Sequence, residues 1–237
     1  MKNFTFFLSI CVLIVSLILQ RPCVSVASEG VWVWRTPAET NPNYGTRKLF
    51  IFQGHFRTNA GEVMFISQGP RPWPIIDQEK SVVLVYRLDK LIPPRFINRI
   101  HLQIKTRWEA RGIRVKGIQI DYDSPTQKLG LYSAWLSRLR QVVPIEEPIS
   151  ITGLCDWLVS ARDEEVLDLT ASADFIAFMM YRGTRPLKLA DSYIKKLQRA
   201  EFNFYIGLLK SQLANPLFSL VRETKGYRGV IVFPLDE

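Results

Sequence analysis

The chain has 237 residues, of which 47% are hydrophobic and 22% are charged, so it is long enough for one large core and too ordinary in composition to be disordered. Its formal net charge of +9 is compatible with acidic polysaccharide, an anionic membrane surface or nucleic acid as a partner. However, many basic residues lie along a predicted amphipathic helix at residues 95–110, which indicates a solvated face. We therefore expect no nucleic-acid site.

An export signal is predicted at residues 1–27. Lys2 precedes an apolar run over residues 4–19, and small residues that end at Ala27 form a signal-peptidase cleavage pattern. The alternative is an uncleaved anchor, because the run is near the lower length limit for a membrane-spanning helix. Cleavage removes two of the 31 basic residues and leaves 29 against 22 acidic ones, a net charge of +7. We expect a periplasmic or secreted domain at residues 28–237, which touches a membrane only if the signal stays uncleaved.

No metal site or cofactor is expected. Cys155 is the only cysteine after the predicted signal, which excludes an intrachain disulfide framework and a multi-cysteine metal site. His55 and His101 lack metal-ligand spacing. A calcium loop that starts at Asp121 fails because its sixth position, which requires glycine, is Thr126.

The first third of the chain is predicted to be rich in strands. Strands are expected at residues 31–35 and 48–56, and the prolines and asparagines between them leave no room for a good helix. A turn at residues 59–61 then leads to a further strand at residues 62–67, which together suggest an added hairpin.

From residue 81 onward, strands alternate with helices. Strands are predicted at residues 81–88, 117–123, 148–157, 173–181, 202–209 and 229–234. Helices are predicted at residues 95–110, 187–200 and 212–224, the last interrupted near Pro216. About eight principal strands in this arrangement favour a closed barrel over an open doubly wound sheet. We therefore predict a single α/β domain, a (β/α)8 TIM-like barrel that is irregular in its N-terminal third.

The strand at residues 117–123 and the helix after it form the central unit of this barrel. Because side chains alternate, one face carries Gly117, Gln119, Asp121 and Asp123, and the other carries Ile118, Ile120 and Tyr122. A barrel strand buries its outer face under helices and opens its inner face toward a site at its carboxyl end. Ser124 is expected to cap the next helix, with Pro125 in its first turn. The helix has an apolar stripe of Leu129, Tyr132, Leu136, Leu139 and Val142.

Several motifs resemble a bacterial family catalogued as domain of unknown function 3142. They are Val33-Trp34-Arg35, Gly117-Ile118-Gln119-Ile120-Asp121-Tyr122-Asp123, Ile149-Ser150-Ile151-Thr152-Gly153-Leu154, Asp156-Trp157-Leu158 and Met180-Tyr181-Arg182. The resemblance covers most of the mature chain and implies no established activity. More loosely, the chain is similar to the chitinase-like family 18 glycoside hydrolases, secreted (β/α)8 barrels with D-G-x-D-x-D-x-E on the fourth strand and M-x-Y-D on the sixth.

The hydrolase resemblance is partial. Gln119 and Asp121 stand at the second and third Asp of that pattern, and Asp123 stands at the catalytic Glu. Lys116 replaces the first Asp, and Arg182 replaces the Asp after M-x-Y. Asp123 is one methylene shorter than the Glu that protonates the glycosidic oxygen in those enzymes, so chitinase activity is not predicted.

The residues themselves suggest carboxylate chemistry. Asp121 and Asp123 face the same way about 7 Å apart along the strand, close enough for their titrations to couple. Mutual repulsion would raise one pKa and leave a neutral acid beside an ionised carboxylate, which is what a glycosidase needs. Asp156, at the end of the next strand, is a candidate second carboxylate, and Tyr181 can stabilise developing charge by a hydrogen bond.

The candidate substrate-binding residues are Trp34, Arg35, Tyr86, Trp157 and Arg182, the two tryptophans by stacking on sugar rings. An alternative is that Asp121 and Asp123 belong to a structural ion-pair network with Arg35, Arg87 or Arg182, and that the tryptophans are part of the core.

We predict an exported, glycosidase-like barrel that acts on or binds polysaccharide. Asp123 is its expected acid and Asp121 the partner, with Asp156 and Tyr181 assisting. The alternative is a catalytically inactive barrel that binds glycan or a cell-envelope partner. Lys116, Gln119 and Arg182 favour it, because they stand where the resembling hydrolases have acids. Carboxylates paired with arginines and no open cleft would support this second hypothesis.

Overall fold

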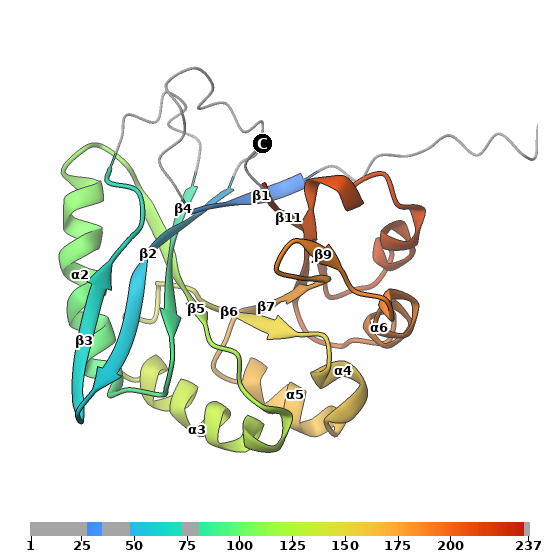
Figure 1. The fold of residues 1–237 in the computed structure, drawn as a ribbon, viewed down its shortest axis with the longest axis horizontal. Helices are drawn as coiled ribbons and strands as arrows, with labels where there is room; N and C mark the ends of the chain where they lie inside the picture. Colours follow the sequence, from blue (N-terminus) through green and yellow to red (C-terminus); the bar gives the residue numbers. More distant parts are fainter. Residues whose placement is uncertain (1–27, 35–47, 73–80, 235–237) are drawn as a thin grey trace, which may run out of the picture.

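The computed structural model describes residues 28–34, 48–72 and 81–234 (Figure 1). The predicted signal at residues 1–27 and the candidate Arg35 lie outside the described residues. Within the described ranges, none of the helices combines the length and the apolar character needed to span a bilayer.

Eight parallel strands form a closed barrel. Their order around the barrel is β1-β11-β10-β7-β6-β5-β4-β2, and β1 also pairs with β2, which closes the sheet. They are β1 (Ser28–Val33), β2 (Lys48–Asn59), β4 (Ser81–Leu88), β5 (Val115–Asp121), β6 (Ile149–Leu154), β7 (Phe175–Met179), β10 (Phe204–Leu209) and β11 (Tyr227–Phe233). The predicted TIM-like barrel is therefore confirmed.

Helices surround the barrel from β4 onward (Figure 1). They are α2 (Pro94–Glu109), α3 (Leu129–Arg140), α4 (Trp157–Ser160), α5 (Asp163–Thr170) and α6 (Ala190–Leu197), with 3₁₀ turns η1 (Thr126–Lys128), η2 (Lys210–Gln212) and η3 (Pro216–Val221). Fewer helices are present than in an ideal barrel of this kind, because in the described part of the chain a hairpin strand rather than a helix follows β2. This strand, β3 (Glu62–Ser67), pairs antiparallel with β2. Its turn uses the positive φ angles of Ala60 (48°) and Gly61 (86°), so the predicted hairpin is confirmed.

The apolar side chains form two clusters, one on each face of the barrel wall. The outward-facing Ile118 and Ile120 of β5 are completely buried in the larger cluster, which also includes the helix side chains. The smaller cluster fills the barrel interior around Trp32, whose indole N–H donates to Gln119 Oε1 at 2.7 Å. The predicted alternation of β5 is thus correct. Burial on both faces is what a parallel barrel strand requires.

The inner cluster depends on one close approach. A Cβ placed on Gly207 of β10 would come within 2.7 Å of the Trp32 ring. Because Gly207 has no side chain, the indole ring can occupy this space. The ring therefore crosses the interior toward β10, while its N–H donates a hydrogen bond to Gln119 of β5. Trp32 therefore forms the floor beneath the carboxyl end of the barrel.

Helix α3 follows the predicted stripe but begins differently. Leu129, Tyr132, Leu136 and Leu139 are buried as expected. The prediction that Ser124 caps the helix is wrong, because η1 comes first and the Ser124 hydroxyl donates instead to the carbonyl of Pro125 at 3.3 Å. The helix therefore begins at Leu129, after η1, and not at the predicted cap.

Two later elements are also shorter than predicted. Strand β6 ends at Leu154, so the strand expected at residues 148–157 is wrong in its last residues, and Trp157 opens α4. The helix expected at residues 212–224 is only the 3₁₀ turn η3. Pro216 is its first residue, and the Asn215 side chain caps it by accepting a hydrogen bond from the Leu217 N–H at 3.0 Å. The predicted interruption near Pro216 is therefore where this turn begins.

Candidate functional site at the barrel mouth

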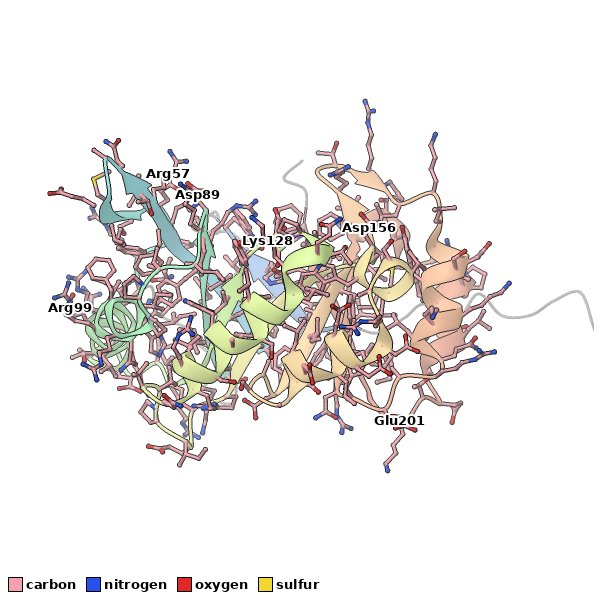
Figure 2. The ribbon with its side chains drawn as sticks, turned by 90° about the horizontal axis from the view of Figure 1, so that it is seen from below. Arg57, Asp89, Arg99, Lys128, Asp156 and Glu201 are labelled. Carbon is pink, nitrogen blue, oxygen red and sulfur yellow. The ribbon has the colours of Figure 1, made fainter. Side chains whose placement is uncertain are left out.

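The carboxyl ends of the barrel strands meet at one end of the molecule, which we call the mouth. In Figure 2, Asp89, Lys128 and Asp156, which follow β4, β5 and β6, are labelled on one side, and Glu201, which precedes β10, is on the opposite side. Polar side chains from neighbouring strands come together at this end. Active sites of parallel barrels lie at this face, so the mouth is the candidate site.

A single guanidinium joins the two predicted aspartates. Arg87 of β4 lies beside Asp121 in the β4–β5 register. Its Nη1 is 2.8 Å from Asp121 Oδ2, and its Nη2 is 2.7 Å from Asp123 Oδ2. The Asp121 side chain is 4% exposed, whereas the side chains of Arg87 and Asp123 are 36% and 44% exposed. The sequence therefore correctly predicts that the carboxylates lie together, and Arg87 keeps them bridged.

Asp121 is held on both oxygens. The Thr152 hydroxyl of β6 donates to Asp121 Oδ1 at 2.8 Å, while Arg87 occupies Oδ2. Burial raises the pKa of Asp121, and the charge of Arg87 and the hydrogen bond from Thr152 oppose this rise without cancelling it. The charge of Asp123 raises the pKa further, but it is a smaller cause than burial. Desolvation is therefore the main cause of the raised pKa of Asp121, and the repulsion expected from the sequence is a smaller one.

The opposite side of the mouth is aromatic. The Trp34 ring stacks on Phe52 with centroids 4.4 Å apart and meets Phe233 edge-on at 5.7 Å. The Tyr181 ring also stacks on Phe233, with ring centroids 5.7 Å apart and an interplanar angle of 15°. Trp34, Tyr181 and Phe233 are partly exposed. Burial, and then the charge of Asp121, raise the pKa of Tyr181 well above its ordinary value, so its hydroxyl remains a hydrogen-bond donor.

Two of the predicted binding residues cannot contact a ligand in the mouth. Tyr86 is fully buried on the outer face of β4, where its hydroxyl is 3.2 Å from His101 Nδ1. Trp157 is fully buried beside α3, and its indole N–H donates to the carbonyl of Ser124 at 2.9 Å. Both predictions are wrong, because these rings pack between strands and helices.

The other predicted residues lie outside the Arg87 group. Asp156 is exposed at the start of α4 and accepts a hydrogen bond from the Tyr193 hydroxyl of α6 at 3.1 Å. It is therefore bound to the helix layer and has no described contact with Asp121 or Asp123. Arg182 is exposed in a short hairpin after β7.

The sequence interpretation missed a second polar group at the mouth. His55 of β2 lies beside Arg87 in the strand register, and its Nε2 is 2.7 Å from Asp89 Oδ1. The Arg57 Nε–H donates to His55 Nδ1 at 3.3 Å, so the imidazole has a partner on each nitrogen. The register of β2 with β4 could have indicated His55, but the bulge after Phe52 conceals that register in the sequence.

Hollows are also found elsewhere on the described structure. One of about 610 Å³ is found at the amino end of the barrel, where Lys48, Phe50 and Phe175 are among its lining residues. Another, of about 330 Å³, lies between α5 and α6. Neither is lined by the mouth residues described above. Across the described ranges, no three His, Cys, Asp or Glu side chains are arranged to hold a metal ion.

Comparison with known proteins confirms the fold, and it confirms the first resemblance over residues 78–182. Residues 78–182 match the family described as "Domain of unknown function (DUF3142)". This segment contains Arg87, Asp121, Asp123, Thr152 and Tyr181, so it includes the charged side of the mouth. A search of curated proteins finds no match.

Solved structures with TM-scores above 0.5 share the fold of this chain. The chain is similar to a new form of xylanase-A-amylase inhibitor protein, XAIP-III, with a TM-score of 0.59, 10% identity and coverage of 86% of this chain and 92% of that one. The xylanase and α-amylase inhibitor protein XAIP-II from Scadoxus multiflorus gives a TM-score of 0.56, 10% identity and coverage of 87% and 93%. The chitinase domain of the spore coat protein CotE from Clostridium difficile gives a TM-score of 0.47 and 11% identity, with coverage of 92% of this chain and 67% of that one.

The TM-scores of 0.59 and 0.56 establish the fold, whereas sequence identities of 10% leave the activity open. The chain is a closed TIM-like barrel, and its residues 78–182 match the model of the DUF3142 domain of unknown function.

Proposed function

We propose that this chain is an exported barrel protein that binds polysaccharide at its mouth without hydrolysing it. The observation that carries the proposal is the bridge from Arg87 to both Asp121 and Asp123. A glycosidase needs one carboxyl group to give a proton to the leaving oxygen and a second to act as base or nucleophile. Here the two candidates share one cation, and Thr152 occupies the remaining oxygen of Asp121.

The aromatic side of the mouth supports binding. Trp34, Tyr181 and Phe233 are partly exposed, and they lie at the same end of the barrel as Arg87 and Asp123. Apolar ring surface with a few fixed polar groups is the usual composition of a small-molecule site. A sugar presents the matching surfaces, because its C–H faces can lie on rings while its hydroxyls bond to charged groups.

A glycoside hydrolase remains the second candidate, and a specific observation favours it. The raised pKa of Asp121 beside Asp123, which is half-exposed, resembles the acid and carboxylate pair of such enzymes. The roles would then be opposite to those expected from sequence, with Asp121 as the acid. Its burial and two hydrogen bonds argue against proton delivery to a substrate.

The Asp123→Asn substitution separates the two functions. We expect the purified protein to bind one or more cell-envelope or exported polysaccharides without releasing reducing ends. Asp123→Asn should change the affinity less than about fivefold, because an exposed ion pair contributes at most about 1 kcal/mol. Trp34→Ala should weaken binding about tenfold or more, because it removes a large aromatic contact. Calorimetric titration and a reducing-end assay measure the two effects.

Asp156→Asn is the matched control, because it makes the same chemical change at a carboxylate bound to α6. Hydrolysis by the original protein that disappears in Asp123→Asn but persists in Asp156→Asn would establish the enzyme and refute the binding proposal. Binding that is unaffected by Trp34→Ala would place the glycan away from the mouth.

The export part of the proposal rests on residues 1–27 alone. The mature protein is expected to begin at Ser28 when it is recovered from the cell envelope or the medium. N-terminal sequencing of the recovered protein tests this. An intact Met1 on a membrane-bound protein would support the uncleaved anchor instead.

A further inference from the structure

A short hairpin after β7 carries two arginines directly opposite each other. Strands β8 (Tyr181–Arg182) and β9 (Arg185–Pro186) pair antiparallel, with Tyr181 opposite Pro186 and Arg182 opposite Arg185. Gly183, with φ of 58°, supplies the turn. We call residues 181–186 the arginine hairpin. Figure 1 shows it, labelled β9, on the α6 side of the barrel.

The two guanidinium groups are not compensated within the described chain. Both side chains are exposed, and no described carboxylate lies within ion-pair distance of either one. Lys188 follows closely, and residues 181–189 contain no acidic residue. Like charges directly opposite on paired strands are destabilising, so folding alone gives no reason for this pair.

The base of the hairpin is fixed. The Met180 carbonyl accepts from the Leu187 N–H at 3.1 Å and from the Gln212 side-chain amide at 3.1 Å. The Met180 N–H in turn donates to the Gly207 carbonyl of β10 at 2.9 Å. A ligand group that binds the two arginines therefore meets a base that is already ordered, which limits the entropy lost on binding.

The two faces of the hairpin differ. Tyr181 belongs to the aromatic side of the mouth through its stacking on Phe233, and alternation along the strand puts Arg182 on the opposite face. A ligand that contacts both faces must extend from the mouth over its rim. A polymer satisfies this requirement, whereas a single sugar ring does not.

We infer that the polysaccharide bound at the mouth is acidic, and that Arg182 and Arg185 bind the oxyanion groups along it. This inference rests on the proposed function and adds the ligand class. A guanidinium presents paired N–H donors that match carboxylate or sulfate oxygens in a bidentate manner. Asp89 and Asp156 lie on neighbouring loops at the same end (Figure 2). Asp123 directly follows β5 at this end as well, so the basic surface is local. A local pair of arginines suits the spaced charges of a glycan better than the continuous phosphate backbone of a nucleic acid or the surface of a bilayer.

The test compares probes that differ only in charge. Oligogalacturonate and its fully methyl-esterified form have the same backbone, with and without carboxylates. We expect the full chain to bind the free acid about tenfold more tightly than the ester. The double variant Arg182→Gln, Arg185→Gln should lose this preference, since hydrogen bonds to charged groups are worth about tenfold in affinity or more. Its melting temperature should not fall, because the substitution removes a like-charge pair.

The double variant Arg107→Gln, Arg111→Gln is the matched control, since it removes two exposed arginines at the amino end of the barrel, where α2 returns to β5. It should keep the preference for the acid. An equal loss in both variants would indicate general electrostatics and overturn the inference. Preference for heparin oligosaccharides over their desulfated form, lost in the hairpin variant alone, would support the inference with sulfate as the oxyanion.

Other outcomes separate this inference from the proposed function. If acid and ester bind equally and Trp34→Ala weakens both, the glycan-binding function stands and the acidic ligand is refuted. Binding of double-stranded DNA or phosphatidylglycerol vesicles more tightly than any glycan, lost in the hairpin variant, would overturn the ligand class. Failure to bind any of these glycans would count against both proposals.

Discussion

Replacing Trp32 with alanine is expected to lower the free energy of unfolding by about 3–5 kcal/mol, the usual range for removing a buried tryptophan. The side chain is 3% exposed and lies at the centre of the inner cluster. Its ring occupies the space above Gly207, where the surrounding strands cannot collapse because the closed sheet fixes their positions. The substitution also removes the partner of Gln119 Oε1, which leaves a buried acceptor unpaired.

Urea unfolding followed by far-ultraviolet circular dichroism measures this loss without relying on tryptophan fluorescence, which the substitution itself changes. Leu131→Ala is the control, because Leu131 is 64% exposed on α3 and should contribute less than about 0.5 kcal/mol. The loss of unfolding free energy for Trp32→Phe should fall between the losses for Trp32→Ala and Leu131→Ala. A loss below about 1 kcal/mol for Trp32→Ala would show that the barrel interior repacks and that Trp32 is not its floor.

The fold was predictable because strand alternation and helix periodicity are local properties. The strand around Gln119 and Asp121 has polar residues on one face and isoleucines on the other, which is the pattern of a barrel strand with a polar inner end. The stripe on α3 has the helical period. Neither property requires knowledge of distant residues, so both could be read from the sequence.

The site was only partly predictable, because its partners are set by strand register. Asp121 and Asp123 were identified from one strand, but their joint partner Arg87 comes from β4 and was only one of three arginines considered. Tyr86 is next to Arg87 and points the other way, but the apolar run Val82–Val85 before it does not show which face of β4 is the inner one. Trp157 was assigned to the end of β6, but the strand stops at Leu154, so its ring packs in the helix layer.

Arg87 is the residue on which the charged side of the mouth depends, so Arg87→Met is the most informative substitution there. At pH 7 we expect a loss of about 2–3 kcal/mol in the free energy of unfolding. Removal of one partner from a fully buried ion pair costs about 3–5 kcal/mol. The Arg87 side chain is 36% exposed, so solvent already screens part of this interaction.

The loss should depend on pH in a direction that follows from Asp121. Burial raises the pKa of Asp121 in the folded protein, and the charge of Arg87 opposes that rise. Without Arg87 the pKa rises further above the value of about 3.9 in the unfolded chain. A raised folded-state pKa gives stability that is fully present below the unfolded value and is lost as the pH rises through the folded value. Arg87→Met should therefore cost less at pH 5 than at pH 8.

Urea unfolding at pH 5 and pH 8 measures this difference for Arg87→Met and for the double variant Arg87→Met, Asp121→Asn. The double variant has no carboxylate at residue 121 to titrate, so its loss should be nearly the same at both pH values and smaller than that of Arg87→Met at pH 8. Equal losses for Arg87→Met at pH 5 and pH 8 would mean that Arg87 stabilises the mouth through packing of its side chain alone. The carboxylates would then be free of its charge, and the strongest argument against a hydrolytic site would disappear.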